Sequence, residues 1–187
     1  MTQMPDGYFD AMYAADPDPW GFETRWYESR KYAITMALLP QPRYERAFEP
    51  GCSIGVLTEL LAERCTSVLS TDIAEAALER ARARNLENVT FEHGSLRDGW
   101  PSGTFDLVVL SEMCYYFTAD ELPGLMAGAV SVLQDGGTLL AAHWRHEVAD
   151  YPTDAEQVHR TLRETAGLTL VAEYRDNDVL IDMFRKV

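Results

Sequence analysis

The sequence predicts an α/β fold in which one doubly wound parallel sheet carries helices on both faces. Three observations predict this class. Strand-like and helix-like stretches alternate five times, the strand-like stretches are short and apolar, and the chain closes with two consecutive β-rich runs. Because parallel strands need crossover connections, the alternation indicates βαβ units. The closing pair indicates a hairpin that adds one antiparallel strand at or near a sheet edge.

The first half of the core shows the alternation most clearly. Residues 46–50 form a short apolar run, and residues 56–64 place Leu57, Leu60 and Leu61 on one helical face. The elements expected next are a strand at 67–71, a helix at 74–84, a strand at 89–92 and a buried apolar strand at 105–110.

Helix-capping patterns mark the second half. Thr118 and Glu121 have the spacing of a capping box before a helix that the Gly136–Gly137 pair should end. Thr153 and Glu156 repeat that spacing before a last helix that should reach residue 166. The remaining strands are expected at 138–144, 168–175 and 179–185, the last two as the closing hairpin.

The first 45 residues belong to no βα unit. Eight of the chain's 20 Phe, Trp and Tyr residues lie between Tyr8 and Tyr32, and residues 27–39 look helical up to Pro40. Two interpretations are compatible: a fixed helical cap on the sheet edge, or an aromatic lid over a ligand. We therefore expect one domain of 187 residues, with a cap or lid at 1–45 and a Rossmann-like core at 46–187.

Composition excludes several classes of protein. With 47% hydrophobic and 25% charged residues the chain is expected to be globular, and a net charge of −14 argues against nucleic acid and anionic membranes as partners. An apolar run of about 20 residues, which would span a bilayer, is absent. The start of the sequence lacks a signal-peptide pattern, and three separated cysteines favour a reducing cytoplasm. The oligomeric state stays open.

The first βα turn should hold a ligand, because open α/β sheets bind ligands beyond the carboxyl ends of their strands. It reads from Glu49 to Gly55 as EPGCSIG. The dinucleotide pattern GxGxxG does not fit, since Ser53 and Val56 occupy its second and third glycine positions. The turn matches the ExGxGxG loop of S-adenosylmethionine (SAM) dependent methyltransferases, with Ser53 for the middle glycine.

Later strand ends supply the rest of this predicted site. Asp72 ends the second strand, where an acid can accept both ribose hydroxyls; its alternative role is to cap the next helix. Ser95 and Leu96 fall where many such enzymes hold the adenine edge. The segment Ser111–Phe117 should face the crevice and line the methionine arm and the acceptor.

At this point the chain resembles the nodulation protein S (NodS-like) family. The resemblance rests on GCSIGVLT, LSEMCYYF, the N-terminal DPW…WYESRKYA and the later HWR…YPTDAEQVH, and it covers nearly the whole chain. It implies the seven-stranded class I methyltransferase sheet with its last strand antiparallel, and N-methylation of a chitooligosaccharide. It also implies that Glu49, Gly51, Gly55, Asp72 and Ile73 hold SAM, with Tyr27 and Arg30 at the methionine end. The candidate cofactor-binding residues are therefore Tyr27, Arg30, Glu49, Gly51, Cys52, Ser53, Gly55, Asp72, Ile73, Ser95, Leu96 and Ser111.

A hydroxyl acceptor would need a base to take its proton, whereas a neutral amine would need little more than alignment. The best candidate base is His143, expected at a strand end facing the crevice, and Glu112 is the second. With His146 these residues would make at most a weak magnesium site, so we expect none.

The expected acceptor is a carbohydrate or another sugar-containing small molecule. A short chain leaves the acceptor site open at the sheet top, and aromatic side chains can stack on pyranose faces. The candidate acceptor-binding residues are Trp20, Trp26, Tyr115, Tyr116, Trp144 and His146. The alternatives are a methyltransferase of a non-sugar metabolite and a SAM-binding protein without catalysis. A nucleotide-binding oxidoreductase is disfavoured by the loop spacing.

Overall fold

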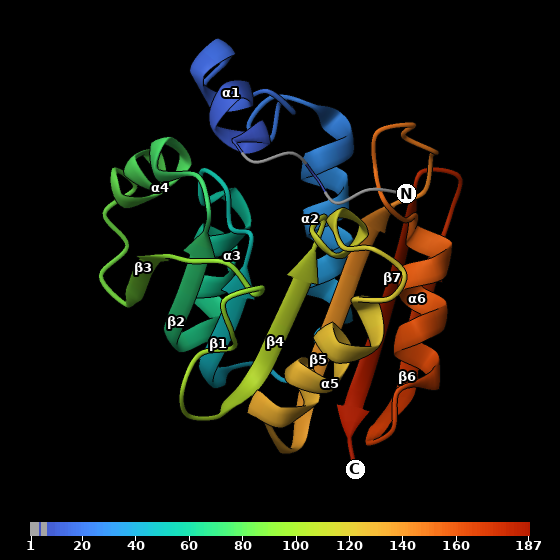
Figure 1. Cartoon of the computed structure of the whole chain (residues 1–187). Coiled ribbons are helices and arrows are strands. Elements are labelled where there is room, and N and C mark those ends of the chain that lie inside the picture. The colour runs from blue at the N-terminus through green and yellow to red at the C-terminus, as the bar shows by residue number, and fades with distance from the viewer. Residues whose placement is uncertain (1–3, 5–6) are drawn as a thin grey trace.

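The computed structural model describes residue 4 and residues 7–187 and has the predicted seven-stranded sheet (Figure 1). The strand order is β3-β2-β1-β4-β5-β7-β6, and β7 runs antiparallel to both neighbours. The strands are β1 (Tyr44–Pro50), β2 (Cys65–Asp72), β3 (Val89–His93), β4 (Phe105–Ser111), β5 (Leu133–Trp144), β6 (Leu168–Arg175) and β7 (Val179–Lys186). The helices are α1 (Tyr8–Ala15), α2 (Trp26–Leu38), α3 (Val56–Arg64), α4 (Glu75–Arg82), α5 (Leu122–Val132) and α6 (Ala155–Glu164), with a 3₁₀ turn η1 (Cys114–Tyr116).

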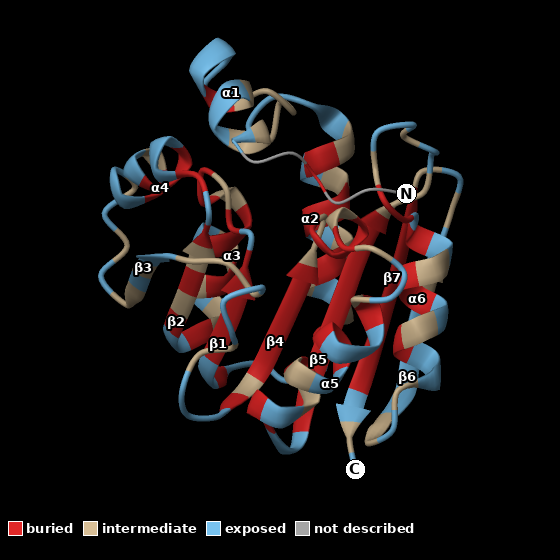
Figure 2. Cartoon of the chain, viewed as in Figure 1, coloured by how far each residue is buried: buried red, intermediate tan, exposed pale blue. Residues whose placement is uncertain are grey.

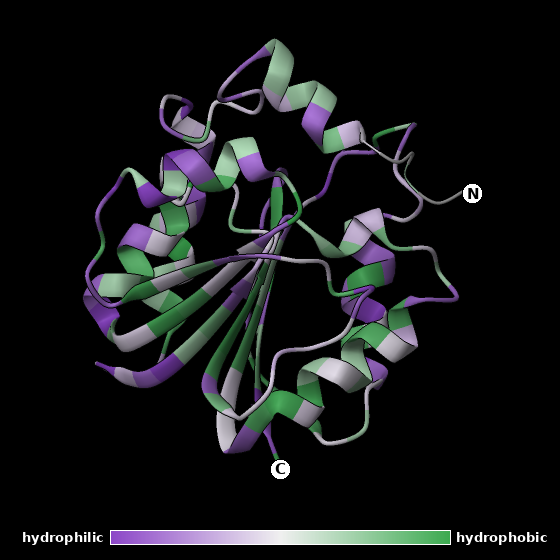
Figure 3. Ribbon diagram, turned by 60° about the vertical axis from the view of Figure 1, so that its left-hand side comes forward, coloured by the Kyte–Doolittle hydropathy of each residue, from purple (hydrophilic) through white to green (hydrophobic). Residues whose placement is uncertain are grey.

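The central strands are buried on both faces, which explains their continuous apolar sequence. Along β4, Leu107 and Val109 pack with residues of α2 and α3, while Val108 and Leu110 pack with residues of α5 and α6. Figure 2 shows β4, β5 and β7 as almost unbroken buried strands, and Figure 3 shows that much of the sheet is hydrophobic. Helices therefore cover both faces of the sheet and fix the positions of its strand ends.

Several predicted boundaries need correction. The β3–β4 connection, residues 94–104, forms turns, so four of the five predicted βα steps contain a helix. Helix α5 ends at Val132, and the Gly136–Gly137 pair lies inside β5, where its register against β4 shifts. Three extra residues are accommodated there, because Phe105 pairs with Leu133 but Leu107 with Thr138.

The last helix is capped one residue later than predicted. Asp154, not Thr153, accepts the hydrogen bond from Gln157 N at 2.8 Å. The Thr153 hydroxyl instead donates to Phe117 O at 3.0 Å, and this joins the start of α6 to the segment after β4. At the first predicted capping box the Glu121 side chain accepts from Thr118 N at 2.7 Å, but α5 begins at Leu122 with Glu121 as its N-cap, so Thr118 does not cap the helix.

The N-terminal segment forms two helices that lie at different positions relative to the sheet. Helix α1 lies beyond the carboxyl ends of β1, β2 and β4, and α2 runs down one face (Figure 1). None of the helices in the part of the chain that the structure describes is long and apolar enough to cross a lipid bilayer.

Candidate functional site

A cavity of about 510 Å³ opens at the carboxyl ends of the parallel strands, below α1. Its lining comes from α1, α2, the turn after β1, the ends of β2 and β4, and the segments that follow β3, β4 and β5. Eleven of the lining residues are Phe, Trp or Tyr. Such a wall offers flat apolar faces with a few polar groups that fix orientation.

The turn after β1 brings the backbone against the cavity. Gly51 has φ 72°, and a Cβ there would lie 3.1 Å from Met113 Cβ, so this close approach requires glycine. The N–H groups of Gly51 and Cys52 both donate to Thr71 O, at 2.7 and 3.0 Å. The turn is therefore fixed to the end of β2 by backbone bonds.

Asp72 connects this turn to the helix that follows. Its Oδ2 accepts from Ser53 N at 2.7 Å and its Oδ1 from Ala74 N at 2.9 Å, and the side chain lines the cavity while 8% exposed. The bond to Ala74 N shows that the local capping role exists. A carboxylate has about four acceptor positions, so both oxygens keep capacity for ribose hydroxyls.

Glu49 is the most buried acid of the cavity, 2% exposed. Its Oε2 accepts from the hydroxyls of Thr58 at 2.6 Å and Ser70 at 2.9 Å. Burial raises the pKa of Glu49 to about 7, although both hydroxyls favour the ionised form. This carboxyl therefore sits deep in the cofactor side and titrates near neutral pH.

These features fit SAM. Gly51 brings the turn's backbone to the cavity, Asp72 can accept from a ribose, and the Glu49 and Asp72 carboxyls complement a cationic ligand. The predicted cofactor-binding residues that line the cavity are Tyr27, Glu49, Gly51, Cys52, Ser53, Asp72, Ile73, Ser95, Leu96 and Ser111.

Two predicted cofactor residues do not line the cavity. Arg30 points to the far side of α2, where its Nη2 lies 2.6 Å from both Asp176 Oδ2 and the Tyr174 hydroxyl. Gly55 has φ 79°, and a Cβ there would meet Ala81 Cβ at 3.1 Å, so this glycine permits α3 to approach α4. Gly55, which the family resemblance placed among the residues that hold SAM, therefore lies outside the cavity lining.

Glu112 follows β4 and connects three segments of the acceptor side. Its Oε1 accepts from the Tyr27 hydroxyl at 3.1 Å and from Lys31 Nζ at 2.9 Å. Its Oε2 accepts from Trp144 N at 2.9 Å and from the Tyr115 hydroxyl. Four donors occupy the acceptor capacity of this carboxylate, which acts as a structural centre for the surrounding aromatic rings.

Lys31 is a fully buried cation behind this wall. Its Nζ lies 2.7 Å from Glu28 Oε2, in addition to its bond with Glu112. The rings of Tyr32, Tyr27 and Phe22 surround the ammonium at 4.9, 5.2 and 6.0 Å. One cation thus serves two carboxylates, and this part of the cavity wall carries a net negative charge.

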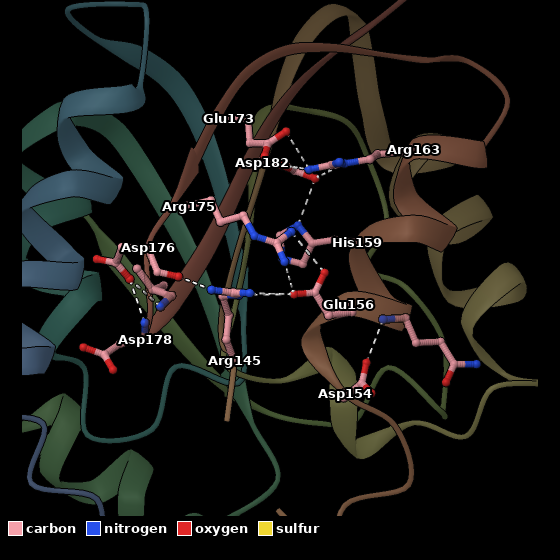
Figure 4. Close-up of polar contacts among 12 residues, drawn as sticks. Arg145, Asp154, Glu156, His159, Arg163, Glu173, Arg175, Asp176, Asp178 and Asp182 are labelled. Atoms are coloured by element: carbon pink, nitrogen blue, oxygen red, sulfur yellow. Dashed lines mark hydrogen bonds and ion pairs between the residues drawn. The ribbon is translucent and has the colours of Figure 1, made fainter. Parts of the chain in front are cut away.

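His143 does not reach the cavity, so the prediction that it faces the crevice is wrong. It is fully buried, its Nε2 accepts from Cys114 N at 3.3 Å, and its Nδ1 lies 3.1 Å from His159 Nε2. His159 Nδ1 lies 2.9 Å from Asp182 Oδ2, and Arg163 also binds this carboxylate (Figure 4).

The direction of these contacts fixes the tautomers. Because His143 Nε2 is an acceptor, Nδ1 carries its proton and donates to His159 Nε2, while His159 Nδ1 faces the Asp182 carboxylate. Burial is the largest cause that holds the pKa of His143 well below its usual value. His143 is therefore a neutral residue that positions η1 from below, with both nitrogens already bonded.

The predicted acceptor residues separate into two groups. Trp20, Tyr115, Tyr116 and Trp144 line the cavity. Trp26 is 76% exposed and does not line it. His146 also lies outside the cavity, paired with Asp178 at 2.9 Å and tilted against the Trp144 ring.

The weak metal site considered from the sequence is not assembled. Within residue 4 and residues 7–187, no group of three or more His, Cys, Asp or Glu side chains is arranged to hold a metal ion. The His143 nitrogens bond to Cys114 and His159, and His146 pairs with Asp178.

Sequence reasoning missed several lining residues, of which Glu28 matters most. Glu28 and Lys31 have the i, i+3 spacing of a helical ion pair, but that pattern is more often found on a solvated face. Tyr151 was missed as well, and Tyr13 was considered only as part of the N-terminal aromatic cap or lid; Tyr13 hydrogen-bonds Ser53, and Tyr151 stacks on Tyr115 at 4.9 Å. Since these contacts join distant segments, local spacing could not reveal them.

Known proteins resemble this chain over most of its length. The methyltransferase domain family matches residues 47–137. Nodulation protein S of Sinorhizobium fredii is 26% identical over 198 residues, covering 100% of this chain and 91% of that protein. A crystal structure from Pseudomonas syringae, named only as a candidate methyltransferase, is 38% identical, covers 87% of this chain and 100% of its own, and has a TM-score of 0.76.

The fold comparison agrees. The crystal structure of N-methyltransferase NodS from Bradyrhizobium japonicum WM9, in complex with S-adenosyl-L-homocysteine, aligns with a TM-score of 0.84 at 24% identity. The alignment covers 97% of this chain and 99% of that one.

Proposed function

The chain belongs to the class I SAM-dependent methyltransferases and resembles the nodulation protein S family, and from that premise we propose that it methylates an amine or hydroxyl of a carbohydrate. One observation carries the proposal: the aromatic wall of Trp20, Tyr115, Tyr116 and Trp144 is continuous with the cofactor turn in a single cavity. An acceptor held on that wall would lie beside the cofactor.

The amine is the better match of the two acceptor groups. SAM supplies, when bound, a methyl group already activated on a cationic sulfur, so holding the acceptor in line provides much of the rate. A hydroxyl requires a well-placed strong base. The histidine predicted for that task, His143, lies outside the cavity with both nitrogens bonded.

The chain's own groups divide the work. Glu49, Gly51 and Asp72 hold the cofactor side, and Glu112 orients Tyr27 and Tyr115 against the acceptor. The rings exclude water from the reacting atoms and present flat faces for a sugar.

A methyl-transfer screen tests this proposal. Purified protein with SAM is offered glucosamine oligomers, their N-acetylated forms, partly methylated oligosaccharides and simple amines, and products are identified by mass. We expect transfer to a sugar nitrogen or oxygen. Transfer to non-sugar acceptors alone would favour a small-metabolite enzyme, and SAM binding without any transfer would favour a non-catalytic role.

We further propose that α1 is a lid. Its Phe9 packs on Tyr116 at 4.8 Å and its Tyr13 hydrogen-bonds Ser53, so this helix contacts both sides of the cavity. Amide exchange in residues 8–15 should slow when SAM and acceptor bind. Equal exchange in both states would indicate a fixed cap.

The cytoplasm is the proposed location. The three cysteines of the chain are free and buried, as expected for a protein of a reducing compartment.

A further inference from the structure

Glu28 is a cavity carboxylate that neither the sequence motifs nor the cofactor site accounts for. It lies in the first turn of α2, lines the cavity and is 6% exposed. Lys31 Nζ lies 2.7 Å from its Oε2. Since a carboxylate has about four acceptor positions, Glu28 keeps capacity for a further proton.

The other acids of the cavity are committed elsewhere. Glu112 already accepts from four donors. Glu49 and Asp72 lie on the cofactor side, where Thr58 and Ser70 hold Glu49 and the N–H groups of Ser53 and Ala74 hold Asp72. Glu28 is therefore the carboxylate that lines the part of the cavity proposed for the methyl acceptor and can still accept a further hydrogen bond.

We propose that Glu28 is the general base that takes a proton from an ammonium acceptor, an inference that rests on the proposed methyl transfer. Aliphatic amines are protonated at neutral pH and lack the lone pair that methylation needs. An N–H bond of the ammonium breaks and its proton forms an O–H bond on Glu28. The nitrogen keeps the electron pair and forms its bond to the methyl carbon, while the pair of the broken carbon–sulfur bond stays on sulfur.

The charges around Glu28 suit both binding and proton transfer. Two carboxylates share Lys31, so the wall attracts a cationic acceptor that the aromatic rings can also stabilise. The titratable groups that face Glu28 are Tyr27, Lys31 and Tyr32 on α2 and Glu112 after β4. Burial raises the pKa of Glu28, Lys31 lowers it and Glu112 raises it, with a net upward shift that increases its affinity for a proton.

Glu28→Gln tests the role, because it preserves size and removes the proton acceptor. With glucosamine oligomers as the probe, we expect turnover at pH 7 to fall by about 10²–10⁴-fold. The loss should shrink as pH rises toward that at which the free amine forms by itself. The matched control is Glu63→Gln on the exposed face of α3, which should behave as wild type. Glu28→Asp should restore part of the activity, provided that circular dichroism shows both variants folded.

Two results would overturn the base role: a loss of turnover in Glu28→Gln that is constant across pH, or a pH-dependent loss of turnover in Glu49→Gln instead.

A second measurement does not depend on turnover. The ¹³C resonance of the Glu28 carboxyl should titrate above the usual glutamate range in the free protein and should shift on binding glucosamine but not N-acetylglucosamine. If the wild-type protein shows these NMR changes but methylates no sugar, the proposed function is wrong and the base role is not contradicted. If the Glu28 resonance does not respond, the base role is wrong and the proposed function is not contradicted.

Discussion

The two sides of the cavity are held together by different kinds of contact. On the cofactor side, backbone groups do most of the work: Gly51 and Cys52 bond to Thr71, and Asp72 binds Ser53, about 20 residues away. On the acceptor side, side chains do it: Glu112 binds Tyr27 and Lys31, which lie 85 and 81 residues away in sequence. This difference shows that a contiguous sequence motif can predict the cofactor side of the cavity but not the acceptor side.

The largest expected effect lies on the cofactor side. Asp72→Ala removes two charge-assisted hydrogen bonds to ribose, each worth about 1.5–3 kcal/mol, so SAM affinity should fall by at least about 100-fold. Calorimetry measures it, with Glu75→Ala on α4 as the control, since Glu75 pairs with Arg82 outside the cavity. Unchanged affinity would leave Asp72 with its bonds to Ser53 and Ala74 alone.

On the acceptor side, the largest expected effect is instead a loss of unfolding free energy. Lys31→Met leaves Glu28 and Glu112 buried without their cation, and breaking a buried ion pair costs about 3–5 kcal/mol. Urea unfolding should show this loss, and Lys31→Met with Glu28→Gln should recover part of it. Lys186→Met, at the far end of the sheet, is the control. A stability equal to wild type would mean that the two carboxylates become protonated at little cost.

The fold was largely predictable because its signals are local. The apolar run of β4, the leucine face of α3 and the Asp176–Asp178 turn before β7 each indicate one element. The prediction of element boundaries failed where tertiary contacts determine the local structure. Gly136 and Gly137 look like a helix end but lie in the irregular part of β5.

The site divides in the same way. Glu49 and Gly51 line the cavity as predicted because they belong to one contiguous turn motif, and Asp72 does so because it ends the next strand. Arg30 and Lys31 are neighbours in sequence, yet one faces Asp176 and the other faces Glu112, which only the rotation of α2 decides. Likewise His143 stands at a strand end, as predicted, but the face on which its ring lies is set by the packing of His159.

Glu49 in the cavity and His143, which is buried outside it, should respond oppositely to pH. The pKa of Glu49 is raised to about 7, so its contribution to stability is present below its unfolded pKa of about 4.3 and is lost as pH rises through 7. The pKa of His143 is lowered, so its contribution is present above about 6.5 and is lost as pH falls below that value.

Unfolding free energies between pH 5 and 7 can separate these effects. Glu49→Gln should make stability rise more steeply with pH, and His143→Gln should make it rise less steeply. Each change is at most about 1.4 kcal/mol per pH unit. Identical slopes in wild type and both variants would show that neither group keeps a shifted pKa.

The smallest expected effect concerns Trp26, which was predicted to bind the acceptor but is 76% exposed outside the cavity. Its ring is already in water, so Trp26→Ala should change stability by less than about 0.5 kcal/mol. On a single amino-sugar ring its KM should match that of wild type, whereas Trp144→Ala removes a cavity wall and should raise KM clearly. The informative comparison is with longer glucosamine oligomers. If Trp26→Ala raises KM for those alone, the acceptor extends out of the cavity past the start of α2, and the exposed ring binds a second sugar. If it changes neither, recognition is confined to the aromatic wall around Glu112.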